Sequence, residues 1–170
     1  MKVQNYRRER VFSLFIIVMG LFIDQISKRL AFEHLRNSPV EKFLWETVRL
    51  MYTENTGGFG SLGSDWSEVS KIIFLKLLPL IILSWMAVMI FRGKLSDRNE
   101  MVGYALILSG GLSNLIDRFY SGFVIDYLYV GIGPIGTHIF NLADVFITFG
   151  VSGLLLSKSW ECTRFMRHNN

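Results

Sequence analysis

Residues 11–32, VFSLFIIVMGLFIDQISKRLAF, are the stretch that decides the fold. No charged residue occurs between Val11 and Ile23, and a helix needs about 20 mostly apolar residues to cross a bilayer. The basic segment before it, KVQNYRRER, is typical of a secretory signal peptide, but no small-residue cleavage site follows the apolar run. Asp24, Lys28 and Arg29 follow instead. We therefore interpret residues 11–32 as a retained first membrane helix.

Three further apolar blocks have the same character. Residues 72–91 carry Lys76 as their only charge, residues 101–118 are uncharged as far as Ile116, and residues 139–157 carry only Asp144. The hydrophobic fraction of 51% is within reach of a soluble domain, so the grouping of apolar residues is the stronger observation. The sequence predicts an all-α membrane protein with four transmembrane helices in a single domain, residues 1–170.

The two segments between these helices on the opposite side from the termini, residues 33–71 and 119–138, are predicted to face outward. Each contains a strand-like run, VRLMYT at 48–53 and FVIDYLYV at 123–130, and the first is followed by a glycine-rich turn, ENTGGFGSLG. A small outward-facing β-sheet, or at least extended segments, is therefore expected over the helices.

Basic residues indicate the orientation. Because four helices place both ends of the chain on one side, ten lysines and arginines gather there, and the positive-inside rule makes that side cytoplasmic. These ten are Lys2, Arg7, Arg8, Arg10, Arg92, Lys94, Arg98, Lys158, Arg164 and Arg167. The net charge of +4 therefore fits membrane orientation better than nucleic-acid binding. The single cysteine, Cys162, excludes an internal disulfide.

Ionisable side chains inside apolar helices are costly and are candidates for function. Asp24 and Lys28 lie four residues apart on one helical face, either as an ion pair or as a supporting wall of an outward site. In GGLSNLIDR, the spacing of Asn114, Asp117 and Arg118 places them on one face. A structural role is favoured for Asp117, whereas Arg118 could end the helix or bind a carbonyl-rich or anionic ligand.

Asn55 lies in NTGGFG, where its side-chain amide could bind a peptide main chain or simply form a turn. The motif alone favours the turn. It is not a phosphate-binding loop, because the lysine and the Ser/Thr of that motif are missing.

Asp126 and Asp144 form the sharpest pair of candidates. The predicted topology puts both at the outward face, with Asp144 about five residues into the fourth helix and so roughly 7 Å below its outer end. The spacing does not establish contact. If the two carboxylates meet, like-charge repulsion in apolar surroundings leaves the pair with one proton. One carboxylate could then activate water while the other protonates a carbonyl, as in aspartic peptide hydrolysis.

Four motifs in this order resemble those of the lipoprotein signal peptidases, also called signal peptidase II. They are DQISK, NTGGFG, GGLSNLIDR with FVIDYL, and FNLADVFITFG, and they extend from Asp24 to about Gly150. Two departures stand out: NTGGFG is one residue shorter than usual, which leaves the path of this loop open, and Ser113 stands where glycine is common.

The resemblance implies an aspartic endopeptidase of the bacterial plasma (inner) membrane, with its active site near the outer face. It would remove the signal peptide of prolipoproteins before a cysteine that carries diacylglycerol, as a monomer without cofactor or metal, and would bind globomycin-type inhibitors. The matching residues are Asp126 and Asp144 as catalytic dyad; Asn55, Asn114, Arg118 and Asn141 as substrate-binding residues; and Asp24, Lys28, Asp117 and Gly57 as supporting residues.

A small ion- or proton-coupled transporter is the main alternative, since such proteins also use intramembrane carboxylates. Four helices without an inverted repeat are few for a transporter. A serine–lysine protease is a weaker alternative, because the adjacent Ser27 and Lys28 point about 100° apart on a helix.

Overall fold

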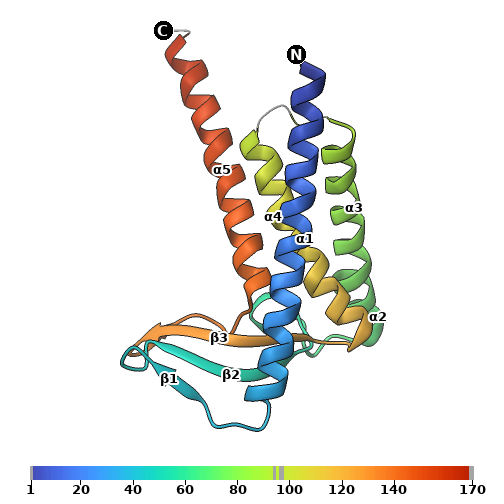
Figure 1. Ribbon diagram of the computed structural model, residues 1–170. Helices are drawn as coiled ribbons and strands as arrows, with labels where there is room; N and C mark the ends of the chain where they lie inside the picture. The colour runs from blue at the N-terminus through green and yellow to red at the C-terminus, as the bar shows by residue number, and fades with distance from the viewer. Residues whose placement is uncertain (1, 94, 96–97, 169–170) are drawn as a thin grey trace.

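The computed structural model describes residues 2–93, 95 and 98–168, with side chains for 7–93, 95 and 98–157. Four long helical rods stand side by side, and a small sheet lies across one end of them (Figure 1). The rods are α1 (Lys2–Leu35), the combined α2, η2 and α3 (Glu68–Lys71, Ile72–Leu77 and Leu78–Phe91), α4 (Arg98–Tyr120) and α5 (Leu142–His168).

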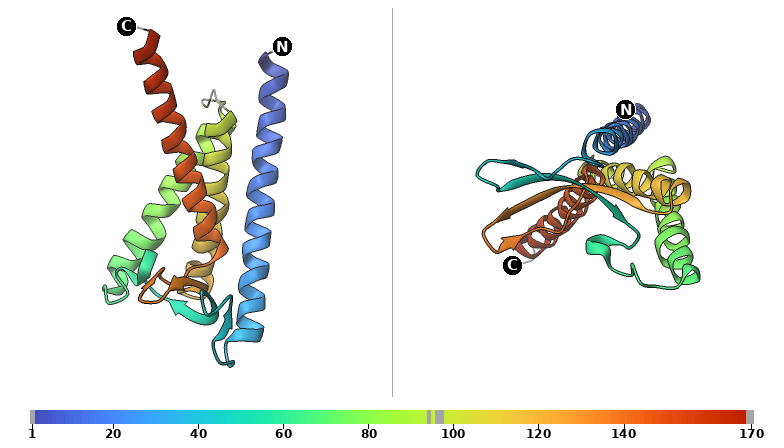
Figure 2. Two further views of the ribbon diagram at one scale, coloured as in Figure 1. Left: turned by 90° about the vertical axis from the view of Figure 1, so that its left-hand side faces the viewer. Right: turned by 90° about the horizontal axis from the view of Figure 1, so that it is seen from below.

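Both chain termini lie at the end of the bundle opposite the sheet, as two views at right angles show (Figures 1 and 2). We call these two ends the terminal end and the sheet end. The turn after α3 also lies at the terminal end, and Lys94, one of the ten orienting basic residues, falls outside the described residues. The chain therefore crosses the bundle four times.

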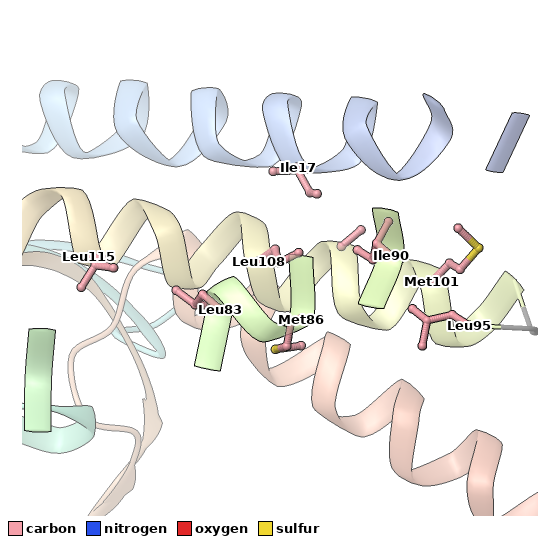
Figure 3. Packing of buried hydrophobic residues seen from close by; sticks show 9 residues of the cluster. Ile17, Leu83, Met86, Ile90, Leu95, Met101, Leu108 and Leu115 are labelled. Carbon is pink, nitrogen blue, oxygen red and sulfur yellow. The ribbon is translucent and has the colours of Figure 1, made fainter. Parts of the chain in front are cut away.

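Helix α4 is the centre of the bundle and packs against α1, α3 and α5. Buried side chains from α1, α3 and α4, among them Ile17, Leu83 and Leu108, form the main apolar core around it (Figure 3). Small residues let α4 and α5 approach closely: a Cβ atom on Gly150 would lie 2.7 Å from the carbonyl oxygen of Gly103. Such close backbone approach is a common means of association between helices in lipid.

The second rod is helical without interruption, but residues Ile72–Leu77 form a π-helical turn. This turn directly precedes Pro79 in the first turn of α3. Proline has no N–H and its ring clashes with the carbonyl of the preceding turn. A widened π turn accommodates both effects without breaking the rod.

Two helical stretches, Arg7–Leu35 and Glu68–Phe91, are long and apolar enough to cross a membrane, judged by length and composition. The stretch Leu142–Ser157 is apolar but shorter. The helices extend beyond the predicted apolar blocks, most clearly α1, which begins at Lys2 rather than at Val11. Charged residues at the ends of a span are good helix formers, so hydropathy marks the apolar part of a helix rather than its ends.

The predicted small sheet is confirmed. Its four antiparallel strands, in the order β1-β2-β3-β4, are β1 (Glu41–Phe43), β2 (Val48–Asn55), β3 (Val124–Ile132) and β4 (Ile135–Gly136). The register between the long strands β2 and β3 shifts between Leu50 and Thr53. A second, smaller core, in which Ala31 and Leu35 of α1 meet Tyr127 of β3, attaches the sheet to α1.

Candidate active site

Asp126 projects from β3, where it is paired in register with Thr53 of β2 and is almost fully buried. Each of its carboxylate oxygens accepts a side-chain amide: Asn141 donates to Oδ1 at 2.6 Å and Asn55 donates to Oδ2 at 2.9 Å. Two amides from different parts of the chain therefore fix the orientation of this carboxylate.

Burial raises the pKa of Asp126 to about 6, because a buried carboxylate loses hydration when it ionises. The two amide hydrogen bonds oppose this rise, and so does the nearby charge of Lys28, whereas the charge of Asp144 adds to it. Asp126 therefore exchanges its proton much closer to neutral pH than an ordinary aspartate does.

Asp144 is the third residue of α5, in its first helical turn. The prediction that it lies about five residues into the helix is wrong. The chain just before α5 is still extended, since Phe140 forms a β-bridge with Leu128, and the helix begins only at Leu142. Asp144 therefore lies closer to the sheet than hydropathy indicated.

Asn141 marks the start of α5 through a reciprocal pair of bonds with Asp144. The backbone N–H of Asp144 donates to Oδ1 of Asn141 at 3.1 Å, and the backbone N–H of Asn141 donates to Oδ2 of Asp144 at 3.2 Å. This is the geometry of a capping box, with Asn and Asp in place of the usual Ser/Thr and Glu. The amide that holds Asp126 thus belongs to the residue that caps the helix of Asp144.

Asn114 of α4 joins the two halves of the site. Its Nδ2 donates to Oδ1 of Asp144 at 3.0 Å, and its Oδ1 accepts from Nδ2 of Asn141 at 3.3 Å. The same Oδ1 accepts from Nζ of Lys28 at 2.7 Å. Asn114 therefore connects the carboxylate pair to a second group of charges on α1.

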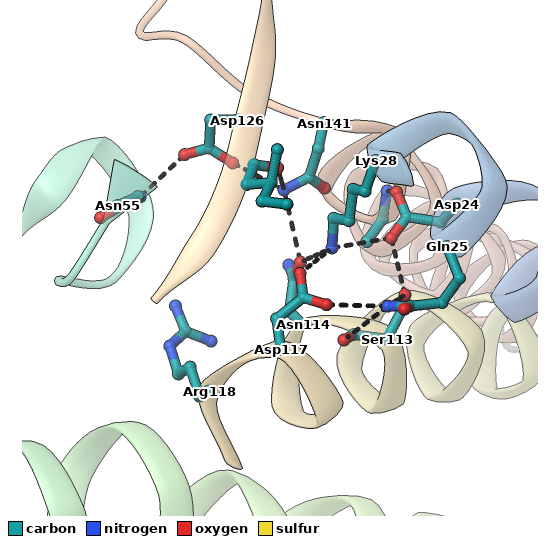
Figure 4. A network of polar contacts seen from close by, with 12 residues as sticks. Asp24, Gln25, Lys28, Asn55, Ser113, Asn114, Asp117, Arg118, Asp126 and Asn141 are labelled. Carbon is teal, nitrogen blue, oxygen red and sulfur yellow. Dashed lines mark hydrogen bonds and ion pairs between the residues drawn. The ribbon is translucent and has the colours of Figure 1, made fainter. Parts of the chain in front are cut away.

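That second group is centred on the buried ammonium of Lys28 (Figure 4). Besides its bond to Asn114, Nζ lies 2.7 Å from Oδ2 of Asp24 and 2.7 Å from Oδ2 of Asp117. The buried positive charge is thus paired with two carboxylates and donates one hydrogen bond, to Asn114. The predicted ion pair of Asp24 with Lys28 exists, and it extends to α4.

Asp24 also contacts α5. Its Oδ1 accepts the backbone N–H of Ala143 at 2.7 Å, and its Oδ2 accepts the hydroxyl of Ser113 at 2.6 Å. The carboxylate thus satisfies an N–H in the first turn of α5, where a negative charge is favoured. A side chain of the first helix therefore helps to position the helix of Asp144.

Gln25 and Ser113 are members of this network that we did not predict. Nε2 of Gln25 donates to Oγ of Ser113 at 2.8 Å and to Oδ1 of Asp117 at 2.8 Å. The available indication was the helical spacing: Gln25 lies three residues before Lys28, so the two polar side chains share one side of the helix.

Arg118 lies at the end of α4, and its Nη2 donates to the carbonyl oxygen of Gly57 at 2.9 Å. Among the described residues, its buried Nε has no hydrogen-bond acceptor. Gly57 in turn donates its N–H to Oδ1 of Asn55 at 2.9 Å. A Cβ atom at Gly57 would lie 2.6 Å from the carbonyl oxygen of Ser61, so only glycine fits the turn. The NTGGFG turn is thus held against α4.

All ten predicted site residues therefore belong to one connected network of hydrogen bonds and ion pairs at the sheet end of the bundle. Asp126 and Asp144 line the same small cavity, together with Asn55, Asn114 and Arg118. Its free volume of about 20 Å³ is close to what one water molecule needs.

Two larger pockets flank this cavity. One, of about 280 Å³, has Asp144 in its wall and is otherwise mainly apolar, lined by Phe59, Phe140, Val145, Thr148 and Phe149 among others. The other, of about 420 Å³, has Asp126 in its wall and is more polar, lined by Arg49, Thr53, Tyr129, Thr137 and His138 among others. His138 and Thr137 contribute to both pockets.

Fold and site together define a helical-bundle protein in which one buried carboxylate, Asp126, and one partly buried carboxylate, Asp144, line a shared cavity at the sheet end. A sequence model of the family described as "Signal peptidase (SPase) II" matches residues 16–160. The chain belongs to the signal peptidase II family, whose members are proteases that process lipoproteins.

Two similar proteins illustrate this membership. The lipoprotein signal peptidase of Borrelia turicatae (strain 91E135) is 34% identical over 155 residues, which are 87% of this chain and 90% of that protein. The lipoprotein signal peptidase of Rickettsia africae (strain ESF-5) is 34% identical over 151 residues, 88% of this chain and 72% of that protein.

Two solved structures share the fold. Both are described as bacterial membrane enzymes determined by the in meso method, at 2.3 Å and 1.9 Å resolution. The first superposes with a TM-score of 0.79 at 23% identity and covers 90% of each chain. The second superposes with a TM-score of 0.72 at 22% identity and covers 86% of this chain and 91% of the other.

Proposed function

We propose that the protein is an aspartic endopeptidase that removes the signal peptide of diacylglyceryl-modified bacterial prolipoproteins and cuts before the lipidated cysteine. Membership of the signal peptidase II family supports cleavage of prolipoprotein signal peptides and favours a protease over a transporter. The observation that carries the aspartic mechanism is the cavity of about 20 Å³ that both Asp126 and Asp144 line.

The chemistry follows from this cavity. It has room for one water molecule, and both carboxylates belong to its wall. Asp126 can carry the proton of the pair as the pH falls towards 6, because burial and the nearby charge of Asp144 raise its pKa to about 6. The ionised carboxylate takes a proton from water as water attacks the scissile carbonyl, and the protonated carboxyl donates its proton to the carbonyl oxygen. The first carboxyl then donates the proton that it took from water to the amide nitrogen, while the second recovers its proton from a hydroxyl of the intermediate. The C–N bond breaks, and the signal peptide leaves with a new carboxyl terminus.

Arg118 and Asn55 are proposed to position the substrate main chain. Both line the cavity, and the buried Nε–H of Arg118 can donate to a peptide carbonyl. The NTGGFG turn, which Arg118 holds through Gly57, would then form one wall of the peptide-binding site.

The flanking pockets suit the two parts of the substrate. The mainly apolar pocket on the Asp144 side fits an acyl chain or the apolar signal peptide, while the polar pocket on the Asp126 side fits the main chain beyond the cysteine. Each acyl CH₂ transferred to water costs about 0.8 kcal/mol, so we propose that the substrate enters sideways from the bilayer.

We further propose four membrane spans, with both termini in the cytoplasm and the site near the outer face. Helix α4 supports this count, because its 23 residues extend about 35 Å and it packs between α1, α3 and α5. The ten basic residues of the termini and of the α3–α4 connection support the orientation.

The direct test is to incubate the purified protein with a diacylglyceryl-modified prolipoprotein and to determine the new N-terminus of the product. We expect a product that begins with the lipidated cysteine, and inhibition by globomycin. The unlipidated prolipoprotein is the matched control. Equal cleavage of both would contradict lipid recognition, and no cleavage of either would contradict the proposed function.

A further inference from the structure

Two hairpin turns lie side by side at the free end of the sheet. Val48 of β2 pairs with Val130 of β3, and the N–H of Gly131 donates to the carbonyl oxygen of Thr47 at 2.8 Å. The β1–β2 turn and the β3–β4 turn are therefore neighbours. We call the four apolar residues that they present the apolar tip: Leu44, Trp45, Ile132 and Ile135.

The apolar tip is the most exposed group of large apolar side chains on the sheet. Trp45 is 99% exposed, and the other three side chains are between 69% and 79% exposed. A cluster of large apolar side chains in water is unfavourable and typically marks a surface that contacts another phase or molecule.

The backbone of the first turn holds these side chains outward at a conformational cost. Leu44, Trp45 and Glu46 have φ angles of 48°, 53° and 68°, in the left-handed region where glycine or asparagine is usual. Charged contacts stabilise the turn: Lys42 Nζ donates to Glu46 Oε1 at 2.8 Å, and Arg49 Nε donates to the carbonyl oxygen of Glu46 at 3.2 Å. Strain that the surroundings maintain in this way is typical of functional segments.

The position of the sheet identifies what the apolar tip contacts. The sheet packs against Ala31 and Leu35 of α1, and the same turns of α1 carry the exposed ion pair of Arg29 with Glu33. Exposed charges at the end of an apolar helix mark the headgroup region of a bilayer. The strands run across the bundle axis at this level, and the free end of the sheet projects past the helices (Figures 1 and 2). In a membrane, lipid would surround the helices below this projecting end.

We propose that the apolar tip inserts into the outer leaflet of the membrane at the headgroup boundary, with Trp45 as its anchor. Tryptophan suits this depth because its ring is apolar and its N–H is polar. The inserted tip would hold the sheet, and with it Asp126 on β3, at a fixed height above the lipid. This inference depends on the membrane location and not on the proposed catalysis.

The test places a fluorescent label at the tip of the protein in lipid nanodiscs. In a Cys162→Ser background, Trp45→Cys and, independently, Ile135→Cys carry the label. Glu46→Cys, in the same turn but ion-paired with Lys42, is the matched control. Lipids with a spin label just below the headgroup quench inserted labels, and iodide quenches labels in water.

We expect lipid quenching at positions 45 and 135 to exceed that at position 46 by about twofold, and iodide quenching to follow the opposite order. Equal iodide quenching at all three positions, without lipid quenching, would place the tip in water and overturn the proposal. Self-quenching that appears only in nanodiscs with two copies would also overturn it, because the tip would then contact a second chain. These quenching measurements do not use enzymatic activity, so their outcome is independent of the proposed function.

Discussion

Asn141 and Asp144 cap the start of α5 for each other, each through its side-chain oxygen and the other's backbone N–H. Asn141 also donates to Asp126 at 2.6 Å. One asparagine therefore determines where the helix begins, how one carboxylate is oriented and where the other is held.

Loss of either carboxylate should abolish cleavage. Asp126→Asn and Asp144→Asn keep the shape of the side chain but cannot exchange a proton, and general acid–base groups contribute about 10² to 10⁴ in rate. Because the two groups act as a unit, the double variant should be scarcely slower than either single one. Single-turnover cleavage by well-folded variants measures this, with Asp117→Asn as a milder comparison. Near-normal turnover in Asp126→Asn or Asp144→Asn would show that the pair is wrong.

The two tasks of Asn141 can be separated. Asn141→Ala should lower the free energy of unfolding by about 0.5–2 kcal/mol through loss of the cap, and should also slow cleavage. Asn141→Ser restores a capping oxygen but not the amide that holds Asp126, so it should regain stability without regaining turnover. Thermal unfolding and single-turnover rates, measured side by side, give the answer. Recovery of both in Asn141→Ser would mean that the amide contact is dispensable.

The pH dependence of stability should report on Asp126. Its pKa is about 6 in the folded protein against 3.8 for an ordinary aspartate, so the folded state binds this proton more tightly than the unfolded state. Its contribution is therefore favourable at acid pH and is lost as pH rises from about 4 to 6, by up to about 3 kcal/mol for two pKa units. Asp126→Asn should lack this loss. Thermal unfolding of both proteins between pH 4.5 and 8 would contradict the interpretation if the difference between them stayed constant.

The buried ammonium of Lys28 should matter more for stability than its exposed neighbour. Lys28→Met leaves Asp24 and Asp117 without their cation, and breaking a buried ion pair costs about 3–5 kcal/mol. Arg29→Met removes only an exposed pair with Glu33, worth about 0–1 kcal/mol. Thermal unfolding in detergent should show a far larger loss for Lys28→Met. Similar losses in the two variants would argue against a structural role for this network.

Both tails should be inaccessible from outside intact cells. In a Cys162→Ser background, Asn5→Cys and His168→Cys should resist a membrane-impermeant thiol reagent until the cells are opened. Asp65→Cys, in the exposed segment at the sheet end, should react at once. Labelling of position 5 or 168 in intact cells would reverse the proposed orientation.

Much of the bundle and of the candidate site was predictable, because apolar burial and the placement of charges in apolar surroundings both involve large free energies. Apolar blocks, and the charge of Asp144 within one of them, show directly in the sequence, whereas Asp126 was singled out because it follows the third apolar block at the same predicted face. The start of α5 was not predictable from hydropathy, because Ile139 and Phe140 are as apolar as the helix although Phe140 belongs to a β-bridge. The family resemblance named Asn141 as a substrate-binding residue. Its role in capping α5 is visible only once the backbone of α5 is placed.

Contacts between distant elements were equally invisible in the sequence. Asp24 and Ala143 are 119 positions apart, and a backbone N–H carries no side-chain signature by which the bond could be recognised. Similarly, nothing in the residue types of Leu44 and Trp45 indicates their left-handed backbone, because such a conformation at non-glycine residues follows from the surrounding contacts.

The hydrogen bond between Asp24 and the N–H of Ala143 joins residues that are synthesised far apart in time. The first helix supplies Asp24 and Lys28, whereas Asn141 and Asp144 stand at the start of α5, the last of the described helices to be synthesised. A nascent chain that ends before residue 141 lacks one carboxylate of the pair and the amide that orients the other. On the proposed function, hydrolysis can therefore begin only after synthesis has delivered α5, so no unfinished enzyme cleaves in the membrane.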